Sequence, residues 1–192
     1  MIDTNMSIHN DITLQVHYLT RGTHLKQAHI LMLKHAESEV HLPVLITNNE
    51  VEALKNAVEV GTFDEIDLAL QVLKSLEARI ECVRIVPDAP GHYHADVIML
   101  ADTGSRHIMT CSVTKGVCLA LRTDCALLMS HSDFVQQQGW IKDNGQVAFP
   151  LPAMTDQLLD EALQVAISEE NYELAATLHK EIKARQQANR HP

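Results

Sequence analysis

Three segments near the start of the chain have the composition of β-strands, because β-branched and other apolar residues dominate them. They are "ITLQVHYL" at 12–19, "AHILMLK" at 28–34 and "HLPVLIT" at 41–47. After them the apolar positions take up a helical spacing. Val51, Leu54 and Val58 recur every three or four residues, which predicts a helix that begins near residue 48.

A second helical pattern, at about 64–78, leads into three further strands. Its apolar residues recur every three or four positions at Ile66, Leu70, Leu73 and Leu76. The strands are "RIECVRIV" at 79–86, "HYHADVIML" at 92–100 and "RHIMTCSV" at 106–113. In the middle strand, polar residues at His92, His94 and Asp96 alternate with apolar ones, which is the pattern of a half-buried strand.

The stretch "CSVTKGVCLALRTD" at 111–124 predicts a third helix, at about Lys115 to Arg122. Thr114 is its expected N-cap, and Arg122 is expected to point outward. A short strand at 125–130 and a last turn of helix at 131–138 follow. Together these elements predict an α+β fold, in which helices flank a mixed or mainly antiparallel sheet.

A linker is expected at 138–154, where two glycines, two prolines and an Asp-Asn-Gly turn signal gather. The residues beyond it, 155–192, form two helical patterns that break at Glu170 to Asn171. This predicts an αα-hairpin joined to a main domain at 1–137. A hairpin of this size cannot bury its apolar stripe alone, so it must pack on the domain, on a second copy or on another protein.

The formal net charge of −10 gives the chain no electrostatic source of tight, nonspecific binding to a phosphate backbone. The start of the chain has neither a basic nor an apolar leader segment, and no apolar run reaches the length that spans a bilayer, so we expect a cytoplasmic protein. Its four cysteines lie on a predicted strand–helix–strand run and another strand, so we expect free thiols and no zinc site.

The hairpin resembles the UVR motif, the helical pair shared by the B and C subunits of the bacterial excision nuclease and by several other bacterial proteins. The matching residues are "ALQVAISEENYELAATLHKEIKAR", of which "EENYELAA" followed by "L..EI" is the most specific part. In that family the motif serves protein contacts. The resemblance therefore implies an interaction surface that includes Leu174, Leu178 and Ile182.

The main domain resembles the bifunctional nuclease family, whose members act on both DNA and RNA. The similar segments follow in order: "LPVLITNNEVEAL", "DLALQVLKSLEARIECVRI", "GHYHADVIML" and "CSVTKGVCLALRTDCALLMSHSDF". Members of this family carry UVR hairpins at the same end of the chain. The two resemblances therefore support each other.

The chain departs from the family pattern where that pattern is acidic. The family has an Asp-Ala-Arg-Pro-Ser-Asp-Ala run before "LALR", whereas residues 110–116 here read "TCSVTKG". Both acids and the arginine are absent. The Thr-His-Asp that opens the family's second helix is here Glu65, Ile66 and Asp67, so only Asp67 persists.

Phosphodiester hydrolysis uses carboxylates that hold divalent cations, Mg²⁺ or Mn²⁺ in this case. The remaining candidates are Glu50 and Asp67 as catalytic residues and metal ligands, with Asp96 as a third ligand. Solvated surface acids are the alternative interpretation of all three. Lys115 replaces an acid, which would repel a cation, but beside a helix N-terminus it is a candidate phosphate-binding residue or a solvated lysine.

His92 and His94 have a metal-ligand spacing on one face of a strand, although in a chain with twelve histidines structural or solvated roles are the stronger interpretation. Two functional hypotheses follow. One is a protein-interaction or regulatory module of nuclease ancestry, which binds a protein partner or a second copy through its hairpin. The other is an active metal-dependent nuclease that hydrolyses DNA or RNA.

Overall fold

A seven-stranded sheet forms the centre of the computed structural model, which describes residues 10–21, 29–58, 63–141 and 147–188. Its strand order is β3-β2-β1-β7-β4-β5-β6, and β4–β7 is the parallel pair among antiparallel ones. The strands are β1 (Asp11–Arg21), β2 (His29–His35), β3 (His41–Ile46), β4 (Ala78–Ala89), β5 (His92–Ala101), β6 (Arg106–Ser112) and β7 (Ala126–Ser130). The predicted α+β fold with a mixed, mainly antiparallel sheet is confirmed.

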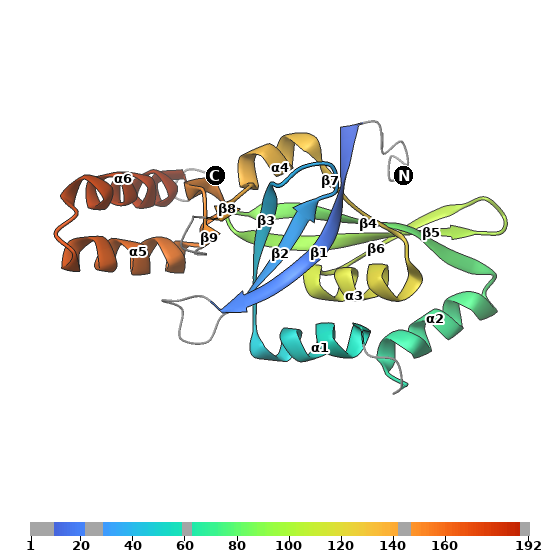
Figure 1. The fold of residues 1–192 in the computed structure, drawn as a ribbon. Coiled ribbons are helices and arrows are strands. Elements are labelled where there is room, and N and C mark those ends of the chain that lie inside the picture. The colour runs from blue at the N-terminus through green and yellow to red at the C-terminus, as the bar shows by residue number, and fades with distance from the viewer. Residues whose placement is uncertain (1–9, 22–28, 59–62, 142–146, 189–192) are drawn as a thin grey trace.

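Helices α1 (Asn48–Val58), α2 (Glu65–Ser75) and α3 (Val113–Thr123) lie on one side of the strands in Figure 1, and the short α4 (His131–Gln137) lies on the other. α3 packs against β4 and β5. This close approach depends on Gly116, because a Cβ atom there would collide with the Cβ of Ala95. The glycine therefore lets α3 sit directly on the sheet.

The main core consists almost entirely of aliphatic side chains. Alternation places Val83 and Ile85 of β4 and Ala95 and Val97 of β5 inward, where they meet Val117 of α3. β2 and β3 add consecutive buried residues. The half-buried pattern predicted for 92–100 is confirmed on its apolar side.

In two predicted helices, α1 and α2, the buried face ends before the apolar pattern of the sequence does. Val58 of α1 is 67% exposed, and Ala57 occupies the inward position in its place. Leu76 lies one residue beyond α2 and is 68% exposed, although Ile66, Leu70 and Leu73 pack against the core as predicted. In both cases the apolar pattern runs past the point where the helix still faces the sheet.

α3 begins two residues earlier than predicted. Its N-cap is Ser112, whose side chain accepts a hydrogen bond from the backbone N–H of Lys115, so Thr114 is not the cap. The outward orientation expected for Arg122 is also wrong, because only 15% of its side chain is exposed. Both residues instead contact segments that are distant in the sequence.

The predicted linker contains the short strands β8 (Trp140–Ile141) and β9 (Val147–Ala148) and the 3₁₀ turn η2 (Leu151–Ala153). Residues 142–146 of this linker, and the ends 1–9 and 189–192 of the two predicted domains, lie outside the described residues. Gly91, in the β4–β5 turn, packs against Ala153 and Thr155, so the end of the linker is seated on the main domain.

The helices α5 (Asp156–Ser168) and α6 (Tyr172–Ala188) form the predicted hairpin, which projects from the rest of the molecule (Figure 1). The break falls at Glu170, whose φ is +55°. A small core of Leu159, Ala166, Ala175 and Leu178 lies between the helices, and Leu151 and Met154 extend it toward η2. Within the described part of the chain, no helix is long and apolar enough to cross a membrane.

Candidate functional site

Glu50 connects the first turn of α1 to the first turn of α3. Its Oε2 accepts hydrogen bonds from the backbone N–H and the hydroxyl of Thr47, both at 2.8 Å. The N–H of Glu50 in turn donates to the Thr47 hydroxyl, so the two residues form a capping box. Its Oε1 accepts from the hydroxyl of the buried Thr114 at 2.8 Å.

These contacts set the ionisation of Glu50. Burial by itself would raise the pKa of this carboxyl, but the hydrogen bonds from Thr47 and Thr114 outweigh burial and hold the pKa below its ordinary value. Glu50 is therefore a carboxylate at neutral pH, with a donor on each oxygen.

Asp67 belongs to a second cluster, at the start of α2. The side chain of Asp64 caps this helix, and the N–H of Asp64 donates to Asp67 Oδ2 at 3.2 Å. Arg122 of α3 donates to Asp67 Oδ1 at 2.7 Å and to Asp64 Oδ2 at 2.8 Å. The hydrogen bond from Arg122 lowers the pKa of Asp67, and the N–H of Asp64 adds to this effect.

Arg122 also ends α1. Its guanidinium donates to the main-chain carbonyls of Asn56 at 2.7 Å and Ala57 at 2.9 Å, which are unsatisfied at the C-terminus of a helix. One arginine therefore joins the end of α1, the start of α2 and the end of α3.

Asp96 lies in a third cluster, on the outer side of β5. Its Oδ1 accepts from the hydroxyl of Thr110 on β6 at 2.7 Å, and it lies 3.8 Å from Nε2 of His94. The other ring nitrogen of His94 lies 3.5 Å from Asp88. His94 thus stands between two carboxylates, whereas His92 is exposed.

The three predicted acids therefore have separate sets of partners. Among the residues that the structure describes, no three His, Cys, Asp or Glu side chains are placed to hold a metal ion together. The four cysteines are free, and burial raises the pKa of Cys82 and of Cys118 to about 11, so both are protonated thiols at neutral pH.

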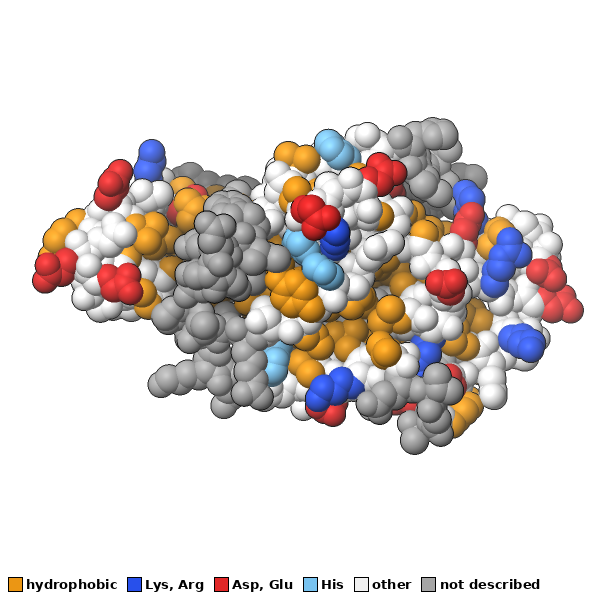
Figure 2. Space-filling model, viewed as in Figure 1, with side chains coloured by type: hydrophobic (Ala, Val, Ile, Leu, Met, Phe, Trp, Pro, Cys, Tyr) orange, Lys and Arg blue, Asp and Glu red, His pale blue; other side chains and the backbone are white. Residues whose placement is uncertain are grey.

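Lys115, which the sequence resemblance aligns with an acid, has an exposed side chain on the first turn of α3. Its backbone N–H donates a hydrogen bond to the hydroxyl of Ser112. On the face drawn in Figure 2, Lys and Arg side chains are scattered among acidic ones and do not form a continuous basic surface. The phosphate-binding role of Lys115 stays a prediction.

The three hairpin residues have different surroundings. Leu178 is 2% exposed inside the hairpin core, and Ile182 packs against that core. Leu174 is 45% exposed, near the break between the helices. Ile167 and Tyr172, for which the sequence pattern predicted no role, are also exposed at this end. We call Ile167, Tyr172 and Leu174 the hairpin tip.

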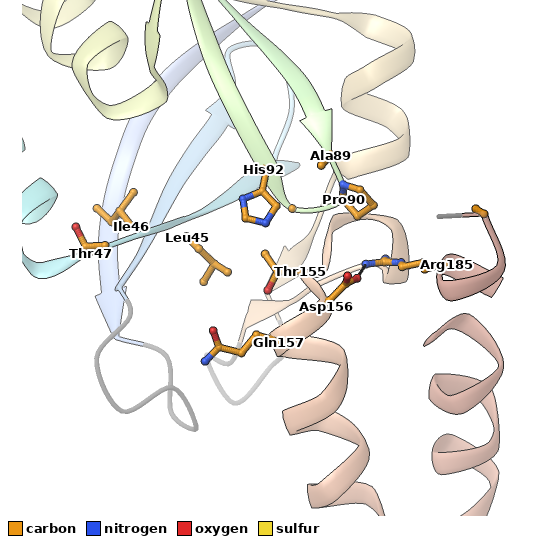
Figure 3. A pocket seen from close by; sticks show the side chains of 12 residues that line it. Leu45, Ile46, Thr47, Ala89, Pro90, His92, Thr155, Asp156, Gln157 and Arg185 are labelled. Atoms are coloured by element: carbon orange, nitrogen blue, oxygen red, sulfur yellow. Dashed lines mark hydrogen bonds and ion pairs between the residues drawn. The ribbon is translucent and has the colours of Figure 1, made fainter. Parts of the chain in front are cut away.

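A pocket of about 790 Å³ lies between the domain and the base of the hairpin (Figure 3). Its walls come from three places: the end of β3, the β4–β5 turn with His92, and the first residues of α5 with Arg185 of α6. Arg185 turns toward Asp156 in Figure 3, and it donates to this carboxylate at 3.0 Å. None of Glu50, Asp67 and Asp96 lines the pocket.

Arg185 resembles Arg122 in its contacts. It donates to the carbonyls of Leu151 and Met154 and to the carboxylates of Asp156 and Glu181. Neither arginine stands out from the sequence as a functional residue. An arginine near a helix end is common in sequences. Only when the fold is known does it become clear which acids in other segments it pairs with.

A family model described as bifunctional nuclease domain matches residues 31–142, which is more than half of the chain. The match begins within β2, continues through α4 and β8, and ends before the hairpin. No curated protein matches the chain at a significant level.

Proposed function

Because the chain belongs to the bifunctional nuclease domain family, the question is what this member does with the fold, and we propose that it is a protein-binding module. In this proposal the family domain carries the hairpin, and the hairpin that projects from it binds the partner.

One observation carries the first half of this proposal. All four carboxylate oxygens of Glu50 and Asp67 already accept hydrogen bonds, from Thr47, Thr114, Asp64 and Arg122. An oxygen that accepts one hydrogen bond can still bind a metal ion through its other lone pair. These two carboxylates have separate partners, however, and among the described residues no three His, Cys, Asp or Glu side chains are placed to hold an ion together. Their arrangement supports a structural role.

The hairpin tip supports the second half. Ile167, Tyr172 and Leu174 are 48%, 69% and 45% exposed, whereas the other apolar residues between the two helices are buried or partly buried. Three exposed acids, Glu169, Glu170 and Glu173, lie next to them along the chain. The tip therefore suits a protein surface that is apolar at its centre and basic at its rim.

The proposal is tested with the full chain as bait for affinity capture, followed by affinity measurement with each purified partner. The double variant Tyr172→Ala with Leu174→Lys is compared with Leu121→Lys, a change at an exposed residue of α3. We expect at least a tenfold weaker affinity for the tip variant and an unchanged affinity for the control. Equal affinity of all three chains would refute a role for the tip.

A further inference from the structure

The strand β6 forms one edge of the sheet and lacks the protection that the other edge has. β3, at the opposite edge, contains Pro43, and Gly139 packs against this proline and donates its N–H to the carbonyl of His41. β6 pairs with β5 without a bulge and contains neither proline nor lysine. Prolines, lysines, bulges and covering segments are what usually keep an edge strand from pairing with another chain. β6 has none of these features.

The backbone of β6 directs a row of polar groups away from the sheet. In an antiparallel pair, every second residue bonds the partner strand, and the residues between them point their N–H and C=O groups the other way. The turn between β5 and β6 fixes which residues these are, because the N–H of Ala101 donates to the carbonyl of Ser105 at 3.0 Å. The odd-numbered residues of β6 therefore face β5, and the outward groups belong to Arg106, Ile108 and Thr110.

The side chains of β6 leave this outward row accessible. Arg106 turns back across the sheet and donates to both carboxylate oxygens of Glu81 on β4, at 2.8 and 2.7 Å. Ile108 and Met109 are 42% and 45% exposed, and as neighbours in a strand they lie on opposite faces. No other residue that the structure describes forms a hydrogen bond with the outward backbone groups. The middle of this edge is therefore open, with an apolar side chain on each face.

A cation lies beside the end of β6. Lys115 is exposed on the first turn of α3, which follows β6 directly. Burial raises the pKa of the Cys111 thiol and the Lys115 ammonium partly offsets this rise, so the ammonium is close to the strand on its α3 side. Within the described ranges, no acid forms an ion pair with Lys115. A carboxylate on a bound chain would therefore meet an uncompensated positive charge here.

We propose that β6 binds an extended segment of a partner protein, which adds an eighth strand to the sheet, antiparallel to β6. Only an extended backbone offers donors and acceptors at the spacing of the outward row, and antiparallel bonds are the more stable kind. The segment has two adjacent apolar residues, opposite Ile108 and Met109. It also has an acidic residue opposite Cys111, on the side where Lys115 can reach it.

This surface is independent of the hairpin tip. It lies on the family domain, and its affinity comes from main-chain hydrogen bonds, whereas the tip presents exposed side chains of two helices. The protein would then have two separate places for binding other proteins. Failure of one of them leaves the other untouched.

A synthetic peptide as long as β6, seven residues, tests the proposal with the full chain. Its sequence is Thr-Glu-Thr-Val-Ile-Thr-Thr, which places Glu opposite Cys111, Val opposite Met109 and Ile opposite Ile108. Fluorescence anisotropy should show saturable binding. Methylation of the backbone nitrogens of its third and fifth residues, which would face β6, should abolish binding. Methylation of the fourth and sixth, which would face solvent, should leave the affinity unchanged.

Two matched changes in the protein test the same contacts from the other side. Ile108→Pro removes an outward N–H, whereas Ile108→Thr removes the same apolar side chain and keeps the N–H. We expect the proline variant to bind about tenfold more weakly than the threonine variant, the effect of one lost hydrogen bond. Lys115→Glu should weaken binding about fivefold, and a peptide with Lys in place of Glu should recover it.

Absence of saturable binding by the wild type overturns the proposal, and so does equal affinity for the two methylated peptides. Equal affinity of the proline and threonine variants overturns pairing through the backbone. The tip variant with Tyr172→Ala and Leu174→Lys should bind the peptide as the wild type does, and a loss there would place the peptide on the hairpin and overturn the proposal. Circular dichroism of each variant confirms folding.

Discussion

Arg122 in the domain and Arg185 in the hairpin make the same set of contacts. Each guanidinium donates to two main-chain carbonyls and two carboxylates, and their side chains are 15% and 12% exposed. Their settings differ. Arg122 joins helices that already pack on a large sheet core, whereas Arg185 joins α6 to a short turn and the start of α5.

The same arginine contacts therefore have different consequences beside a large core and beside a small one. The hairpin has four buried residues in its core, so Arg185 is a large part of what fixes its base. In the domain, the ion pairs of Arg122 fix the start of α2, and its hydrogen bonds to the carbonyls of Asn56 and Ala57 hold the end of α1. One of the paired acids, Asp67, is a residue for which the family resemblance predicts a catalytic role. Substitutions in the two regions should therefore differ in how much of the molecule they destabilise, as well as in how much stability they remove.

The largest effect is expected where α3 sits on the sheet. Gly116→Val puts side-chain atoms into the space of Ala95 and Val83, and the overpacking should cost about 3 kcal/mol in the free energy of unfolding. Chemical denaturation measures it. A stability within the error of the wild type would contradict the close packing of α3.

Arg122→Met should lower the free energy of unfolding by about 2 kcal/mol, because charged hydrogen bonds to Asp64 and Asp67 and to two carbonyls are lost. The loss should affect the whole domain in one unfolding transition. Arg106→Met is the matched control, since Arg106 of the edge strand β6 pairs with Glu81 of β4 on a more exposed surface of the sheet. Equal effects of the two changes would contradict a special role for Arg122.

Arg185→Met should act locally. We expect faster hydrogen exchange in α5, α6 and η2, with little change in the main unfolding transition, because the hairpin has few contacts with the sheet. Hydrogen exchange with mass spectrometry separates the two regions. Faster exchange in β4 and β5 would show that the hairpin also stabilises the domain.

The smallest effect is expected from Thr114→Val, which removes one donor from Glu50 and should cost about 1 kcal/mol at neutral pH. The pKa of Glu50 is lowered in the folded state, so its carboxylate favours folding above pH 4.5, and this contribution is lost as the pH falls through the folded pKa. The variant should therefore lose less stability than the wild type between pH 5 and pH 3. If the stability of the two proteins fell equally with pH over this range, the hydrogen bond from Thr114 to Glu50 would be contradicted.

The sequence predicted much of the fold, because alternation at 92–100 and helical spacing at 64–76 are local signals. It also located the hairpin break at Glu170. The contacts of Glu50 and Asp67 could not be predicted in this way, because Thr114 and Arg122 lie 64 and 55 residues away along the chain. Ser112 and Thr114 are both good N-caps, and only the position of Glu50 decides that Thr114 is used elsewhere.

The central claim is that Glu50 and Asp67 hold helices together and do not bind a catalytic metal. The most direct test incubates the purified protein with single-stranded and duplex DNA and RNA in Mg²⁺ or Mn²⁺, and compares it with Glu50→Gln and Asp67→Ala. We predict no cleavage above background for any of the three. Cleavage by the wild type that is lost in both folded variants would contradict the account.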